Sequence, residues 1–167
     1  MPEALTKNGA IGQPLYSSQA TAVHTPGELA WTPDGRMFRY CKAGGTTLVV
    51  GKLQQAAAED TTNFQDLTVT APSAGATSIT TTTTVTLTAN QLAGGYLIVV
   101  SATAGAGQTF RISSHPAVTA AVVTFQLLDP VVTTCTGTVK VDAHPHPYSG
   151  VVVNPTTITS IAVGVAV

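Results

Sequence analysis

The chain has 167 residues, a formal net charge of −1 at pH 7 and only 9% charged residues, and threonine alone outnumbers the acidic and basic residues together. Its seven Lys and Arg residues are scattered, whereas nucleic acids and anionic membranes bind clustered basic residues, so neither is an expected partner. Thr and Val favour strands, and Gly and Pro supply turns, so the composition predicts an all-β protein that forms binding surfaces rather than a catalyst.

The length fits a single domain with an appendage. No apolar run approaches the 18 or so residues of a membrane span, and the N-terminus lacks the basic and apolar regions of a secretory signal. We therefore expect a cytosolic product. In that compartment Cys41 and Cys135 are interpreted as free thiols rather than as a disulfide.

Residues 1–30 differ from the rest of the chain. Turn signals containing Asn, Gly and Pro separate isolated apolar residues, and such a segment cannot form its own core. We expect an extended N-terminal arm that becomes ordered on a partner; the alternative is a disordered leader. The candidate contact residues of the arm are Leu5, Ile11, Leu15, Tyr16 and Val23.

A hairpin is predicted around Thr32-Pro33-Asp34-Gly35, because Pro presets the first central position of a tight turn and Gly accepts the left-handed one. The aromatic residues Trp31, Phe38 and Tyr40 flank this turn. We interpret them as structural anchors in a core, with an exposed contact site as the alternative.

Residues 31–167 form the expected main domain. Short Thr/Val strands recur with a turn signal every 8–12 residues or so, which predicts an antiparallel sandwich or small barrel. Helix is expected only in short connectors, at Gln54 to Glu59 and Asn90 to Leu92. The run Thr80 to Thr84 is interpreted as part of a solvated strand rather than as a linker. The apolar segment Ile158 to Val167 needs a pairing partner, which the barrel, a neighbouring subunit or a further part of a longer chain would supply.

Candidate chemical sites are weak. His144 and His146 have no third ligand nearby in the sequence, and Gly105 to Thr109 lacks the Lys of a phosphate-binding loop. Asp129 and Asp142 end strands, where Asp usually forms a turn, and Ser113-Ser114-His115 has no positioned acid. We therefore expect no enzyme activity, no metal, no cofactor and no small-molecule substrate.

Several stretches resemble structural proteins encoded by tailed bacteriophages. They are residues 28–44, from Glu-Leu-Ala-Trp to Lys-Ala-Gly, together with 48–55, 94–97, 107–112 and the Gly-Val-Val-Val that begins at Gly150. The resemblance covers most of the chain, and its motifs are structural, not catalytic. It implies a capsid decoration, or cement, protein on the capsid exterior of the virion, synthesised in the host cytoplasm.

The same resemblance implies the partners. They are the major capsid protein and further copies of the chain, as a homotrimer. We expect Ala4 to Pro26 to bind the capsid and the β domain to form the trimer. The alternative function is a trimeric tail fibre, spike or adhesin fragment, which should carry aromatic or carboxylate-lined sugar grooves.

Overall fold

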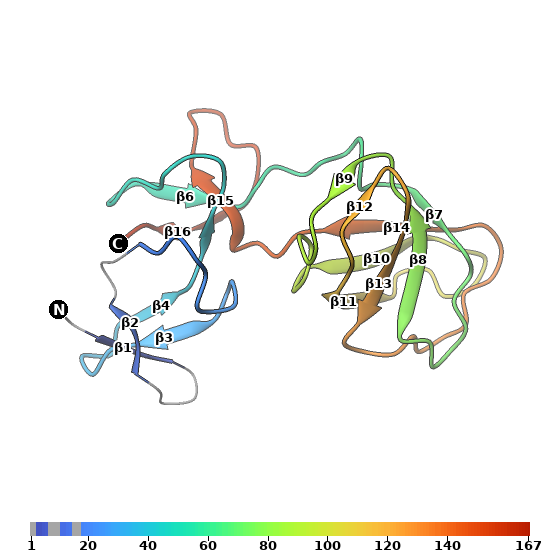
Figure 1. Ribbon diagram of the computed structural model, residues 1–167, viewed down its shortest axis with the longest axis horizontal. Coiled ribbons are helices and arrows are strands. Elements are labelled where there is room, and N and C mark those ends of the chain that lie inside the picture. Colours follow the sequence, from blue (N-terminus) through green and yellow to red (C-terminus); the bar gives the residue numbers. More distant parts are fainter. Residues whose placement is uncertain (1–2, 7–10, 15–17) are drawn as a thin grey trace. The chain divides into compact units, whose positions relative to one another are not determined.

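Two compact units make up the chain (Figure 1). The computed structural model describes residues 3–6, 11–14 and 18–167. The terminal unit combines Met1–Ala58 with Pro147–Val167, and the barrel unit is Glu59–His146. This division differs from the expected boundary at residue 30, because the first hairpin and the last strand both group with the N-terminal segment.

The barrel unit contains a closed barrel in the strand order β10-β11-β13-β8-β7-β14. Every neighbouring pair is antiparallel, so the prediction of an all-β protein with an antiparallel barrel is confirmed. The barrel strands are β7 (Leu67–Val69), β8 (Ser78–Thr82), β10 (Tyr96–Ser101), β11 (Thr109–Ser114), β13 (Val122–Leu127) and β14 (Val139–His144). A separate pair joins β9 (Thr86–Leu87) to β12 (Val118–Thr119).

Alternating side chains fill the barrel. In β11, Phe110 and Ile112 are buried while Thr109, Arg111 and Ser113 are exposed. Successive side chains of a strand point to opposite faces, so this alternation places one set in the core. The core contains Val69, Ile79, Leu87, Leu92, Leu97, Val99, Phe110, Ile112, Val123, Phe125, Leu127, Val131, Cys135, Val139, Val141 and Ala143.

The threonine run is a strand with a break. Thr81 is buried, and its hydroxyl donates a 2.9 Å hydrogen bond to the Thr68 carbonyl. Pairing then stops at Thr83, whose hydroxyl accepts the amide of Val85 at 3.2 Å. This local bond forms a side-chain turn, so the run is a strand only as far as Thr82, and Thr81 and Thr83 are buried where a solvated strand was expected.

The terminal unit contains two four-stranded sheets. One has the order β2-β1-β3-β4, and its strands are β1 (Glu3–Thr6), β2 (Ile11–Pro14), β3 (Leu29–Trp31) and β4 (Met37–Arg39). The other has the order β16-β6-β15-β5, and its strands are β5 (Lys42–Ala43), β6 (Leu53–Gln55), β15 (Ser149–Val153) and β16 (Ala162–Val165). The expected C-terminal strand thus pairs with β6, not with the barrel.

The predicted first hairpin is confirmed. Strands β3 and β4 pair antiparallel, and the Gly35 amide donates to the Thr32 carbonyl at 2.9 Å across the turn. Gly35 has a φ of 85°, a conformation that its missing Cβ permits. The Thr32 hydroxyl also donates to the Asp34 carboxylate, which lowers the pKa of Asp34 below its ordinary value.

The two expected helical connectors are wrong. Gln54 and Gln55 belong to β6, which pairs with both β15 and β16, so long-range pairing prevails over local helix propensity. At the second site, Asn90 has a φ of 59°, and this left-handed residue cannot continue a right-handed helix. The described residues contain no helix, and hence none that could cross a membrane.

Candidate functional site

An open groove of about 1030 Å³ runs along the terminal unit. Both sheets of the unit contribute to it, one through β3 and β4 and the other through β5 and β16. Its apolar lining includes Met37, Phe38, Leu48, Val50, Val151, Val163 and Val165. A space of this size among apolar side chains means that the two sheets do not close over a shared core.

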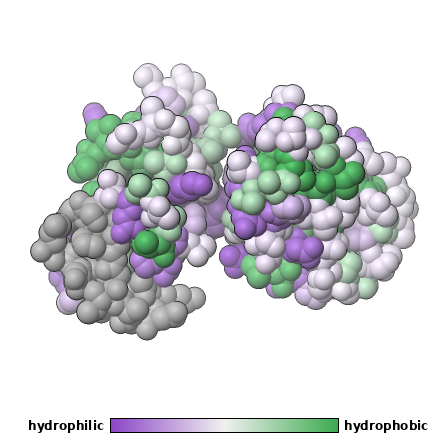
Figure 2. All heavy atoms as spheres, in the orientation of Figure 1, coloured by the Kyte–Doolittle hydropathy of each residue, from purple (hydrophilic) through white to green (hydrophobic). Residues whose placement is uncertain are grey.

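Exposed apolar side chains concentrate on the same unit. Those of the terminal unit are Val23, Met37, Val49, Val50, Leu53, Ile158, Ile161, Val165 and Val167, whereas the larger barrel unit exposes Val100, Val122, Leu128 and Val132. Figure 2 shows hydrophobic residues gathered near the end of β6 and the C-terminus. A large exposed apolar patch marks an interaction site, whereas single exposed apolar side chains are normal on a protein surface.

Buried polar atoms of the terminal unit also lack partners. Among the described residues, no hydrogen bond reaches Gln54 Oε1, Gln55 Oε1 or Asn154 Oδ1. Gln54 is only 3% exposed and lines the groove, and its Nε2 donates to the carbonyls of Val49 and Lys52. An unpaired buried acceptor costs about 1–3 kcal/mol, so these oxygens lower the stability of the terminal unit.

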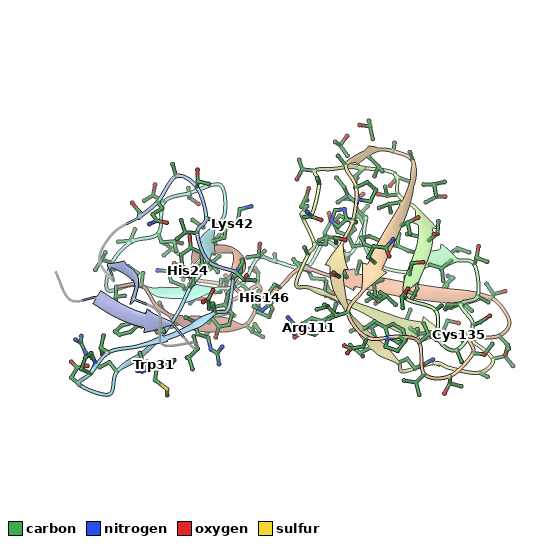
Figure 3. The ribbon with its side chains drawn as sticks, turned by 60° about the horizontal axis from the view of Figure 1, so that its bottom comes forward. His24, Trp31, Lys42, Arg111, Cys135 and His146 are labelled. Atoms are coloured by element: carbon green, nitrogen blue, oxygen red, sulfur yellow. The ribbon has the colours of Figure 1, made fainter. Side chains whose placement is uncertain are left out.

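Polar contacts border the groove. Arg39 donates to the Gly27 carbonyl at 2.9 Å, and its guanidinium lies 5.6 Å from the ring centroid of Tyr148. His24 pairs with Glu28 at 3.3 Å. His24, Trp31 and Lys42 are labelled on the terminal unit in Figure 3. The groove is therefore lined by both apolar and charged side chains, as protein interfaces are.

The predicted arm residues fall into three groups. Leu5 and Ile11 are paired with each other in β1 and β2, and Leu5 also pairs with Trp31 of β3. Val23 is 59% exposed and belongs to no strand. Leu15 and Tyr16 lie outside the described residues. Part of the expected arm is therefore anchored by backbone pairing to the hairpin.

The predicted anchors Trp31, Phe38 and Tyr40 are half-buried rather than fully buried. Trp31 and Phe38 lie on β3 and β4, and Tyr40 follows β4 and packs edge-on against His24, with centroids 5.3 Å apart. Phe38 and Tyr40 line the groove, so these rings contribute to a surface as well as to packing.

The weak chemical motifs have structural contacts. His144 pairs with Glu59 at 3.4 Å, and Asp142 accepts the Asp66 amide at 2.8 Å. Among the described residues, no group of three or more His, Cys, Asp or Glu side chains is placed to hold a metal ion.

The side chain of Gln108 holds the glycine-rich loop at 105–109 in place by hydrogen bonds. Its Oε1 accepts the amides of Val132 and Thr133 at 3.1 and 2.9 Å, and its Nε2 donates to the carbonyls of Gly105 and Thr133 at 2.9 Å each. The Gln108 side chain thus joins two loops of the barrel unit, and the segment is a turn that leads into β11.

Both cysteines are free. Burial raises the pKa of the Cys41 thiol, and burial also raises the pKa of Cys135, against a smaller opposing effect of Gln108. Cys41 is half-buried and lines the groove, whereas Cys135 is buried in the barrel core. Neither thiol has the lowered pKa that a nucleophile requires.

The groove itself was not predicted from the sequence. No local sequence pattern indicates it, because its lining residues come from segments as distant in the chain as Met37 and Val165, which strand pairing brings together.

Comparison with protein-family models, with curated proteins and with solved structures found no match. The groove is therefore a candidate functional site on the basis of its geometry alone.

Proposed function

We propose that the chain is a decoration protein of a tailed-phage head, which binds the outer surface of the capsid and stabilises the lattice by bridging capsomers. The observation that carries this proposal is the contrast between the two units. The barrel has a filled core, whereas the terminal unit leaves its apolar residues exposed around an open groove. A structural protein that functions by contact needs such surfaces and no reactive group.

The major capsid protein is the proposed partner, and the chain acts as a homotrimer on the virion exterior. Several weak contacts per oligomer then act together, since binding at one site raises the effective concentration at the others. Bridging increases the number of contacts that must break before neighbouring capsomers separate under internal DNA pressure.

The arm supplies the proposed capsid contact. Strand β2 is an edge of its sheet, and an exposed edge can add a strand of another protein through backbone hydrogen bonds. Residues 18–23 are exposed and lie in no strand, so Val23 is available to a partner. Ser18, Gln19, Ala20 and Ala22 of this segment also line the groove, whereas Val23 does not.

Labelling of particles tests the location. Antibodies against the barrel unit, carried on gold and viewed by electron microscopy, should mark the heads of phage particles that contain the chain. Labelling confined to tail tips or fibres would contradict the proposal and favour the tail-fibre alternative.

A further inference from the structure

We propose that the groove of the terminal unit binds a second copy of this chain, through an apolar patch on that copy's own terminal unit. The subunits would then associate head to tail around a closed ring. This inference rests on the surfaces of the subunit and holds whether or not the partner of the assembled protein is a capsid. It also assigns assembly to the terminal unit instead of to the barrel.

The groove is the receiving surface. Met37, Val50, Val165 and Val167 line it and are all at least 48% exposed, so the subunit alone leaves its lining in water. An occupant of the groove should therefore be apolar.

One wall of the groove is an unprotected sheet edge. Of the edge strands of the two sheets, β2 contains Pro14, β4 contains Arg39 and β5 contains Lys42, whereas β16 has the sequence Ala-Val-Gly-Val. Monomeric proteins protect edge strands with charge or Pro, because an open edge invites pairing with another chain. The irregular register of β16 around Val163 bends the strand but adds no charge.

The backbone of this edge is oriented for pairing. Ala166 donates to the Lys52 carbonyl at 3.2 Å and accepts the Gly51 amide at 2.9 Å, so its two groups face the side of β6. Because backbone groups alternate along a strand, those of Val165 and Val167 point to the opposite side. Residues 163–167 all line the groove, as expected when a strand presents its edge.

The inserting surface lies on the same unit but outside the groove. We define the outer patch as Leu53, Ile158 and Ile161, which are 43%, 69% and 63% exposed and do not line the groove. Two contacts hold these residues near β6, since Gln55 Nε2 donates to Thr159 Oγ1 at 2.7 Å and the Ala56 amide donates to the Ile161 carbonyl at 2.9 Å.

The chemistry of the outer patch fits the groove. Residues 156–161 contain Ile, Thr and Ser without any charged side chain, and they lie in no strand, so they can extend along an open edge. The whole chain has a net charge of only −1, so copies repel one another little. Seven of the nine exposed apolar side chains of the terminal unit belong to the two surfaces, so each interface would cover the four of the groove on one copy and the three of the outer patch on the next.

Because each contact joins two different surfaces of the subunit, it determines the symmetry of the oligomer. A patch that fits a groove elsewhere on the same subunit makes a heterologous contact, which closes into a ring when the rotation permits. Side chains of both surfaces are exposed in the described part of the subunit, and association covers both surfaces at once.

Sedimentation and light scattering of the full chain and its variants test the inference. The wild type should form a closed oligomer, whereas Val165→Glu in the groove and Ile158→Glu in the patch should each be monomeric, with dissociation constants raised about a hundredfold or more by the buried charge. Val132→Glu, at an 80% exposed site of the barrel unit, is the matched control and should assemble like the wild type. Retained circular dichroism and barrel unfolding temperature show that each variant is folded.

Mixing the two defective variants gives the sharpest readout. The intact groove of Ile158→Glu accepts the intact patch of Val165→Glu, so the mixture should form one-to-one dimers that do not extend. A monomeric wild type would overturn the inference while leaving capsid binding open. A Val165→Glu variant that stays assembled, or a mixture that stays monomeric, would also overturn it.

Discussion

His115 accepts the backbone amide of Leu92 at its Nε2 atom, over 3.0 Å, and both residues are buried in the barrel unit. An amide can only donate, so Nε2 is the acceptor and the ring N–H lies on Nδ1, 2.9 Å from the Pro116 carbonyl. The ring also packs edge-on against Phe125, with centroids 5.3 Å apart. This histidine therefore joins the 90–95 turn to the barrel.

Replacing His115 with Ala should lower the free energy of unfolding by about 2–4 kcal/mol, because the Leu92 amide loses its acceptor and Phe125 loses a packing partner. Denaturant titration measures the change. His144→Ala is the control, since its half-exposed pair with Glu59 is worth less than about 1 kcal/mol. Equal losses in the two variants would contradict the assigned role.

Gln108→Glu should destabilise the barrel unit by about 2 kcal/mol, because a carboxylate accepts the Val132 and Thr133 amides but cannot donate to the carbonyls of Gly105 and Thr133. Gln91→Glu is the matched control. Only its Oε1 is used, as the acceptor for the Thr88 amide and hydroxyl, so this substitution should change stability by less than about 0.5 kcal/mol. The prediction fails if both variants unfold at the same denaturant concentration.

The two thiols should react with an alkylating reagent at different rates. Their raised pKa values keep both neutral at pH 7, so each should react more slowly than a free thiol, with a rate that rises as the pH increases toward the thiol pKa. Half-buried Cys41 should be labelled first, and buried Cys135 only after local opening. Mass spectrometry of timed samples gives the order, and faster labelling of Cys135 would be incompatible with its core position.

Cys41 also reports on the groove that it lines. If a second copy occupies the groove, Cys41 in the wild type should be labelled more slowly than in monomeric Val165→Glu. Cys135 should show no such difference, because it belongs to the barrel unit.

Val23→Glu should weaken binding to undecorated heads by about tenfold or more while leaving the oligomer intact, since a charge replaces an apolar contact in the proposed arm. Co-sedimentation with heads measures the affinity. Val132→Glu should bind like the wild type. Unchanged binding of Val23→Glu would remove this residue from the capsid contact.

Local chemistry in the sequence was sufficient to predict much of the fold. Alternation of Val and Thr predicts strands, and Thr32 to Gly35 predicts a hairpin whose turn bonds lie within the turn itself. The prediction failed at Gln54 and Gln55, whose local composition favours helix. Their conformation is determined by strand pairing about 100 residues later in the chain, of Gln55 with Val152 and Ala162 and of Gln54 with Val153 and Gly164.

Less of the candidate site than of the fold could be predicted from the sequence. The groove exists because β16 pairs with β6 and leaves its other edge toward Met37 and Phe38, and no local pattern specifies that register. Likewise, Ser113-Ser114-His115 gives no sign that His115 will meet Leu92, because the contact depends on how the barrel closes. The arm residues Leu5 and Ile11 were recognised as apolar, but their pairing in β1 and β2 was not.

Reconstitution tests the central claim most directly. Heads of the phage that encodes this chain, prepared without it, are incubated with the purified full chain, imaged by cryo-electron microscopy and heated until they release DNA. The account predicts regular density on the outer surface between capsomers and a higher release temperature. Heads that remain bare and release DNA at an unchanged temperature would contradict it.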